Sequence, residues 1–383
     1  MKKFLSMMLT TILVLSMSTV AFAATTDSTA GKFTDEESIT ITKEYVATHA
    51  GTTSPKETFG FTIERGALLA EGGEKVYLKD AAVGVTSENM PLPTIASVEY
   101  NAGAAGNVNP EDPSTVTDYD VKDYMTQDIT ITLPGIKAED SEEEENVYAG
   151  VGVYYYTIKE IAGTTAGVTY YDDEIILVVT VIQDSAGKIR VAAVHTEEAD
   201  SDEKSDEFAN VYSAGSLVVS KEVTGNLGDQ TKDFTVTVTF TAPEGKTVNE
   251  AISYVDGTAS KTISVSDWEN GSATATITLK HDESVTFTNI PYGVTYNVME
   301  DDYSGDGYDA PKYSVNAGAS AEEDEGVDEK ADSASDTVKI TNNKGVEVDT
   351  GITLDSAPYM MMLIIAAAGI AFFLAKKRRY TEN

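Results

Sequence analysis

The stretch that decides the fold is "VYYYTIKE" (Val153–Glu160), which is typical of a β-strand ending in a charged side chain. Successive side chains of a strand face opposite sides of a sheet. One face therefore carries Tyr154, Tyr156, Ile158 and Glu160. This face is the more apolar of the two, and an unpaired carboxylate buried on it is costly. Glu160 is therefore expected to have a polar partner or a catalytic role in the core.

Similar β-rich runs recur along the chain between clusters of Gly, Asp, Asn and Pro, and no long helical period interrupts them. The predicted fold class is all-β, with two tandem immunoglobulin-like β-sandwich domains as the simplest packing. The expected strands lie at 38–43, 59–64, 128–133, 153–160, 174–182, 216–221, 233–240, 274–279, 285–290, 294–300 and 337–341.

A loose internal repeat supports the division into two domains. Each half has a lysine in an opening strand, a glutamate in a middle strand and an asparagine in a closing strand. The boundary is expected near residues 213–215. The matching segments are "SITITKEYV" (38–46) with "SLVVSKEVT" (216–224), "VYYYTIKE" with "VTYNVMED" (294–301), and "DEFANVY" (206–212) with "VKITNNK" (338–344).

Strand parity places these polar residues on apolar faces. Lys43 shares a face with Ile41, and Asn210 shares one with Phe208 and Tyr212. All three polar residues of the first half, Glu160 included, are therefore expected to face one core.

The second half repeats this parity. Lys221 shares a face with Val219, and Glu300 shares one with Val298. The closing strand offers two asparagines, Asn342 and Asn343, of which Asn342 has the parity of the apolar positions 338 and 340. Parity therefore favours Asn342 as the third member.

A lysine, a glutamate and an asparagine facing one core suggest an intramolecular isopeptide bond, formed when the lysine amine attacks the asparagine carboxamide and releases ammonia. The amine must be neutral, and burial can lower a lysine pKa by about 3–5 units. Glu160 and Glu300, held protonated by the same burial, are the predicted catalytic acids for the Lys43–Asn210 and Lys221–Asn342 bonds. Each reaction occurs once, so the chain is not predicted to be an enzyme with turnover. The alternative is an ordinary lysine–glutamate ion pair at the rim of each sheet.

The composition argues against one class of partner, and the two ends of the chain predict an exported protein. With 63 acidic and 27 basic residues the formal net charge is −36, which argues against nucleic-acid partners. Residues 1–23 have the pattern of a signal peptide. The apolar run 357–375, followed by the basic tail 376–383, predicts a membrane span. The chain has no cysteine, so covalent reinforcement would need chemistry other than disulfides.

Longer motifs cover nearly the whole predicted mature chain, and together they are far more specific than any one of them. They include "GVYYYTIKE", "FANVY", "VVSKEVTGNLGDQTKDF", "LKHDESVTFTNIPYGVTYNVMEDDY" and "ITNNKGVEVDTGITLDSAPYMM". The chain resembles the sortase-assembled major (backbone) pilins of Gram-positive bacteria, of the streptococcal type with a pilin isopeptide-linkage domain and a Cna-B-like domain. The resemblance implies Lys–Asn isopeptide bonds with an acidic catalyst in each domain, at the same six positions that parity selects.

The resemblance also implies a sorting signal before the predicted span. "VDTGI" occupies that place, so Val348, Asp349, Thr350 and Gly351 are the expected sortase-processing residues, with cleavage between Thr350 and Gly351. Asp349 stands where the family has proline, which leaves the identity of the sortase open. Lys204 is the candidate polymerisation lysine, six residues before Asn210. The alternatives are a solvated lysine at 204 and a plain membrane-anchored protein.

The resemblance implies a structural major pilin subunit at the cell surface or cell wall, with a transient membrane anchor. Its implied partners are a pilin-type sortase, other copies of itself, accessory pilins and peptidoglycan. A monomeric wall-anchored adhesin is the alternative function, and a secreted hydrolase with paired carboxylates has little support. No cofactor and no metal site are expected, since the three histidines are isolated in the sequence. The expected segments are 1–23, 24–212, 213–345, 346–356, 357–375 and 376–383.

Overall fold

The computed structural model of the chain describes residues 37–48, 52–69, 73–103, 106–107, 126–136, 146–199, 204–322, 326–346 and 357–380. Four larger sheets contain most of the strands, and each takes its strands either from the part before residue 213 or from the part after it. The all-β fold predicted from the sequence is confirmed, and each of the eleven expected runs overlaps a strand.

The first part forms two six-stranded sheets, of order β13-β16-β1-β9-β6 with β8 beside β1, and β15-β14-β12-β2-β7 with β5 beside β12. The strands are β1 (Ser38–Ala47), β2 (Glu57–Arg65), β3 (Ala67–Leu68), β4 (Lys75–Val76), β5 (Leu78–Lys79), β6 (Thr94–Ile95), β7 (Val98–Tyr100), β8 (Gly106–Asn107), β9 (Thr126–Thr132), β10 (Gly135–Ile136), β11 (Val147–Tyr148), β12 (Gly152–Ile161), β13 (Val168–Thr169), β14 (Glu174–Gln183), β15 (Ile189–Glu198) and β16 (Glu207–Tyr212).

The second part pairs a seven-stranded sheet, β20-β19-β22-β17-β27-β24-β25, with a four-stranded one, β21-β18-β23-β26. The elements are β17 (Ala214–Thr224), β18 (Phe234–Thr241), β19 (Ile252–Asp256), β20 (Ala259–Ile263), η2 (Val265–Asp267), β21 (Ser272–Leu279), β22 (Ser284–Pro291), β23 (Thr295–Glu300), η3 (Ser304–Asp306), β24 (Lys312–Val315), β25 (Ala321–Glu322), β26 (Val327–Lys330) and β27 (Ser335–Asn343).

Each part has a core between its two sheets. In the first, Ile41 and Ile129 of one sheet and Tyr156 and Leu177 of the other belong to one cluster of buried residues. A second cluster fills the other sandwich, for example with Val219 of β17. Alternation of apolar and polar residues along the strands produces this arrangement, because only one face of each strand meets the opposite sheet.

The deciding strand, β12, is buried on both faces over its middle. Tyr154, Tyr156 and Ile158 lie fully buried in the core, as their parity predicts. Tyr155 on the opposite face is also only 8% exposed, because a satellite cluster containing residues of β3 and β4 covers it. Thr157 joins this outer cover through a hydrogen bond from its hydroxyl to the carbonyl of Gly66, at 2.8 Å.

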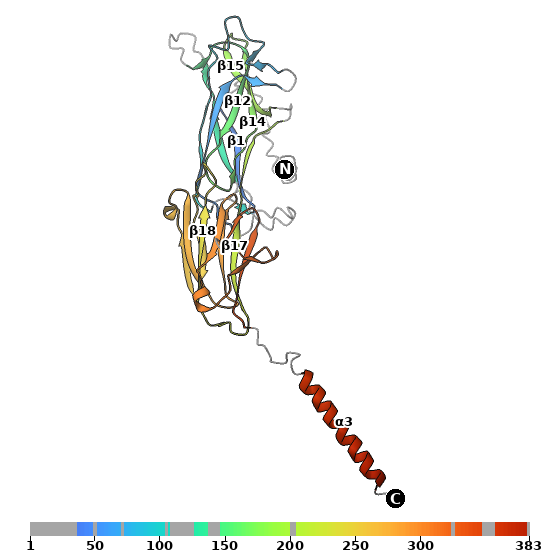
Figure 1. Cartoon of the computed structure of the whole chain (residues 1–383). Coiled ribbons are helices and arrows are strands. Elements are labelled where there is room, and N and C mark those ends of the chain that lie inside the picture. The colour runs from blue at the N-terminus through green and yellow to red at the C-terminus, as the bar shows by residue number, and fades with distance from the viewer. Residues whose placement is uncertain are drawn as a thin grey trace, which may run out of the picture.

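The two sandwiches stack end to end in Figure 1, with β12, β14 and β15 in one and β17 and β18 in the other. The segment 163–167 links the two sandwiches by backbone hydrogen bonds. The N–H of Ala166 donates to the carbonyl of Thr247 at 2.8 Å, and the N–H of Thr247 donates to the carbonyl of Thr164 at 2.8 Å. At Gly167, with φ of +79°, an added Cβ would come within 2.6 Å of the Ser213 carbonyl oxygen. The close approach of the Ser213 backbone, at the junction of the sandwiches, therefore requires glycine at this position.

A long α-helix, α3 (Ala357–Tyr380), ends the described part of the chain (Figure 1). Within the residues that the structure describes, no helix combines the length and the apolar character needed to cross a membrane.

Candidate functional site

The first candidate site lies where the first and last strands of the first sandwich run side by side. β1 and β16 pair in parallel, with Lys43 opposite Phe208 and Tyr45 opposite Asn210. Lys43 and Asn210 are thus offset by two positions along the pair, which places their side chains on the same face. Glu160 reaches this face from β12 in the opposite sheet. The topology brings together residues that are far apart in the sequence.

The three side chains contact one another directly. Lys43 Nζ donates to Asn210 Oδ1 at 2.7 Å and lies 3.3 Å from Glu160 Oε2. The Asn210 amide nitrogen donates a short hydrogen bond to Glu160 Oε1. Lys43 Nζ also donates to the carbonyl oxygens of Glu44 and Phe208, each at 3.0 Å. The side chains of Lys43 and Glu160 are fully buried, and Asn210 is 0% exposed.

Burial shifts both titratable groups of this site towards their neutral forms. Desolvation lowers the pKa of the Lys43 amine from 10.5 to about 8, although Glu160 acts in the opposite direction. Desolvation also raises the pKa of Glu160 against the opposing effect of Lys43. A buried lysine and a buried carboxyl group that are both easily neutralised suit a nucleophile and a proton relay.

The second sandwich repeats the arrangement with the same register. β17 and β27 pair in parallel, with Lys221 opposite Ile340 and Val223 opposite Asn342. Lys221 Nζ donates to Asn342 Oδ1 at 2.6 Å. It also lies 2.6 Å from Oε1 of Glu300, which comes from β23 of the opposite sheet. In both sandwiches the asparagine therefore faces the residue two positions after the lysine.

The electrostatics of the second site match those of the first. Desolvation lowers the pKa of Lys221 from 10.5 to about 8, opposed by Glu300. Desolvation raises the pKa of Glu300, opposed by Lys221. The side chains of Lys221 and Glu300 are both fully buried.

Asn343 is placed differently from Asn342. Its side chain is directed away from the lysine and donates to Asp309 Oδ2 at 2.7 Å. Asn342 is 1% exposed, whereas Asn343 is only partly buried. The structure thus groups Asn342, and not its neighbour, with Lys221 and Glu300.

The remaining candidates lie apart from these sites. Lys204 is exposed, shortly before β16. Val348, Asp349, Thr350 and Gly351 lie outside the described residues, as does the expected signal peptide 1–23. Their roles stay predictions.

Sequence reasoning missed an aromatic ring under each amine. Lys43 Nζ lies 4.3 Å from the centre of the Phe59 ring, and Lys221 Nζ lies 4.2 Å from that of Phe234. Both rings are fully buried and exclude water from the amine, which is the physical cause of the desolvation. Both belong to strands that the sequence predicts, "FGFTIE" and "DFTVTVTF", and their inward parity was the available signal.

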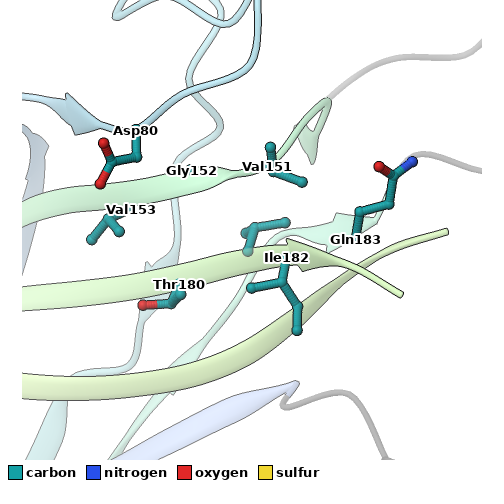
Figure 2. Close-up of a pocket in the computed structure, with 8 residues that line it drawn as sticks. Asp80, Val151, Gly152, Val153, Thr180, Ile182 and Gln183 are labelled. Atoms are coloured by element: carbon teal, nitrogen blue, oxygen red, sulfur yellow. The ribbon is translucent and has the colours of Figure 1, made fainter. Parts of the chain in front are cut away.

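The shallow pocket in Figure 2 lies elsewhere, at one end of β12 and β14. Its lining is largely aliphatic, and Asp80 is its one ionisable residue. A hydrolase with paired carboxylates would need two. Among the described residues, no group of three or more His, Cys, Asp or Glu side chains is placed to hold a metal ion.

Two family models match the chain, one over each sandwich. The family described as "Spy0128-like isopeptide containing domain" matches residues 39–213, and a domain of unknown function (DUF7601) matches residues 215–344. A protein named "Pilin" from Streptococcus pyogenes serotype M1 is 26% identical over 353 residues, which cover 88% of this chain and 90% of that protein. These matches support the Gram-positive pilin family that the sequence predicts.

This pilin family is a structural one and not a family of enzymes, as the sequence predicted. The "Pilus tip adhesin Cpa" of Streptococcus pyogenes is 33% identical over 144 residues, which cover 36% of this chain and 18% of the adhesin. The solved major pilin protein (T3.2) of Streptococcus pyogenes aligns with a TM-score of 0.50 at 20% identity, over 81% of this chain and 99% of that structure. The last comparison bears on the fold alone.

Proposed function

We propose that this chain is the major subunit of a cell-surface pilus and that Lys43–Asn210 and Lys221–Asn342 isopeptide bonds reinforce it. The observation that carries this is the pair of buried Lys–Glu–Asn triads, each joining the first and last strands of one sandwich. In each reaction the neutral lysine Nζ attacks the asparagine Cγ, the bond from Cγ to Nδ2 breaks, and ammonia leaves. Glu160 or Glu300 relays the proton from the amine to the departing nitrogen.

The fixed proximity of each lysine amine to its asparagine carboxamide also accelerates bond formation. Because the strands hold each amine within hydrogen-bond distance of its carboxamide, the effective concentration can reach about 10⁵ M or more. Each lysine and asparagine reacts once.

We further propose the segments expected from the sequence: a signal peptide at 1–23, sandwiches at 24–212 and 213–345, a sorting segment at 346–356, a membrane anchor at 357–375 and a basic tail at 376–383. The anchor rests on the apolar run of the sequence alone, because no helix among the described residues meets the requirements for a span. A pilin-type sortase would cleave between Thr350 and Gly351 and pass the Thr350 carbonyl to Lys204 of another copy. The exposure of Lys204 supports its access to an enzyme. The product is a covalent homopolymer at the cell surface, to which accessory pilins and peptidoglycan would attach.

Lys204→Ala tests polymerisation against the alternative of a monomeric wall-anchored adhesin. If Lys204 joins subunits, the variant loses the high-molecular-weight ladder that the unchanged chain forms with its sortase, while the monomer reaches the surface. Lys188→Ala is the matched control, since Lys188 is another exposed lysine of the same sandwich. Ladders that persist in Lys204→Ala would contradict the assignment of the linking lysine.

A further inference from the structure

Among the described residues, the asparagine of the first triad accepts a hydrogen bond from a backbone N–H, and the asparagine of the second triad does not. In the first sandwich, the backbone N–H of Tyr171 donates to Asn210 Oδ1 at 3.3 Å, beside the hydrogen bond from Lys43. In the described part of the second sandwich, Lys221 is the hydrogen-bond donor to Asn342 Oδ1, and no backbone N–H takes the place of Tyr171.

The chain path explains where this donor comes from. Tyr171 lies between β13, at the edge of one sheet, and β14, in the opposite sheet. The segment crosses from sheet to sheet beside the triad. The Tyr171 ring packs edge-on against Phe208, with centroids 5.0 Å apart, and Phe208 lies opposite Lys43 in the strand pair. This packing fixes the backbone of Tyr171 at the level of the reacting groups.

The position of this N–H matters because Oδ1 is the atom on which negative charge develops. When Lys43 Nζ adds to Asn210 Cγ, the carbonyl electron pair moves onto Oδ1, and it returns when the bond to Nδ2 breaks and ammonia leaves. A preorganised backbone N–H aimed at such an oxygen stabilises the transition state, and loss of one such donor costs about 10²–10³ in rate.

We propose that the Tyr171 N–H is an oxyanion donor for the Lys43–Asn210 bond, so that the first sandwich forms its bond faster than the second. This inference rests on the proposed function. It adds a catalytic group that the sequence cannot reveal, since a backbone N–H has no residue signature. The same N–H also helps to stabilise the ionised form of Glu160, so the test must separate the two effects.

The test follows bond formation after cell-free synthesis of the whole chain. Samples are quenched in acid at successive times, and ammonia loss is assigned to each sandwich by peptide mass mapping. Tyr171→Pro removes the N–H, and a backbone ester at 171, introduced with the α-hydroxy analogue of tyrosine, removes it while keeping the ring. Tyr171→Ala is the matched control, because it keeps the N–H and removes the ring.

We expect the ester and Tyr171→Pro to slow the Lys43–Asn210 bond about 10²-fold, by the same factor at pH 7 and at pH 9. Tyr171→Ala should slow it only a few-fold, and the Lys221–Asn342 bond should keep its rate in all three variants. If Tyr171→Pro fails to fold, the ester decides. An unchanged rate in the ester, a loss that differs between the two pH values, or an equal loss in Tyr171→Ala would overturn the oxyanion role alone. An unmodified chain that never loses ammonia from the first sandwich would overturn both proposals.

Discussion

The two sandwiches present the same three side chains in the same register, yet their glutamates differ in how closely they approach the lysine amine. In the first, Glu160 accepts a hydrogen bond from the Asn210 amide and lies 3.3 Å from the lysine amine. In the second, Glu300 lies 2.6 Å from the lysine amine. A relay must contact both the amine that loses a proton and the amide that gains one. In both triads the carboxyl group lies close to the amine, and in the first it also contacts the amide nitrogen directly, as the proton path requires.

The largest predicted difference between the sandwiches is mechanical. If tension enters at Lys204 and leaves at Thr350, it crosses the second sandwich from β17 to β27, which the Lys221–Asn342 bond would clamp. When the protein is pulled between handles at 204 and 350, loss of this bond in Glu300→Ala should release the chain between Lys221 and Asn342, which lie 121 positions apart. The protein should therefore lengthen by on the order of 400 Å more than the unchanged chain.

Glu160→Ala is the matched comparison in the same pulling experiment. Lys204 lies near the end of the first sandwich, so only the segment 204–212 can peel away, by roughly 30 Å at most. Equal extensions in the two variants would show that the load does not follow the proposed path.

The next effect is the pH dependence of bond formation, which should be shared by the two sites. Only the neutral amine reacts, and burial lowers the pKa of both Lys43 and Lys221 to about 8. Below pH 8 the neutral fraction falls about tenfold per pH unit, so both rates should rise with pH and level off above pH 8. The same time course of ammonia loss measures this, at pH values from 6 to 10. Midpoints near 10.5 would mean that the amines are not desolvated.

The sequence predicted much of this architecture and which lysine, glutamate and asparagine residues meet in each core. The period of two in strands such as 38–43 and 216–221 correctly indicated sandwiches, and it chose Asn342 rather than Asn343 for the lysine-facing position. Parity could not supply the offset that places Asn210 opposite Tyr45, because the pairing of strands 167 positions apart depends on the whole topology. Tyr171 lies outside the strands and acts through its backbone, so no pattern marks it.

Other features escaped prediction because local patterns do not determine tertiary cover. The edge strand β15 carries the polar mixture "IRVAAVHTEE", which hides its alternation. Tyr155 is buried by β3 and β4, and the contact of Ala166 with Thr247 depends on how the sandwiches stack. Parity indicates that the two aromatic rings face inward, but their position under the lysines depends on how the sheets face each other.

The smallest predicted effect is on the free energy of unfolding, and it concerns an ion pair on the outer face of β17 and β27. Lys339 Nζ lies 2.9 Å from Glu222 Oε2 on this outer face, and both side chains are exposed. Glu222→Gln should lower the free energy of unfolding of the second sandwich by only about 0.2–1 kcal/mol, because water screens exposed pairs. Denaturant unfolding measures this. A loss of several kcal/mol would mean that the outer pair, and not the buried triad, holds these strands together.

The central claim is that both triads are covalently linked, and the intact mass of purified residues 24–350 tests it most directly, beside Glu160→Ala and Glu300→Ala. We predict a deficit of two ammonia masses in the unchanged chain and of one in each variant, with the missing bond in the sandwich that carries the substitution. A mass equal to that of the plain sequence would contradict the account and leave the lysines, glutamates and asparagines as ordinary buried partners.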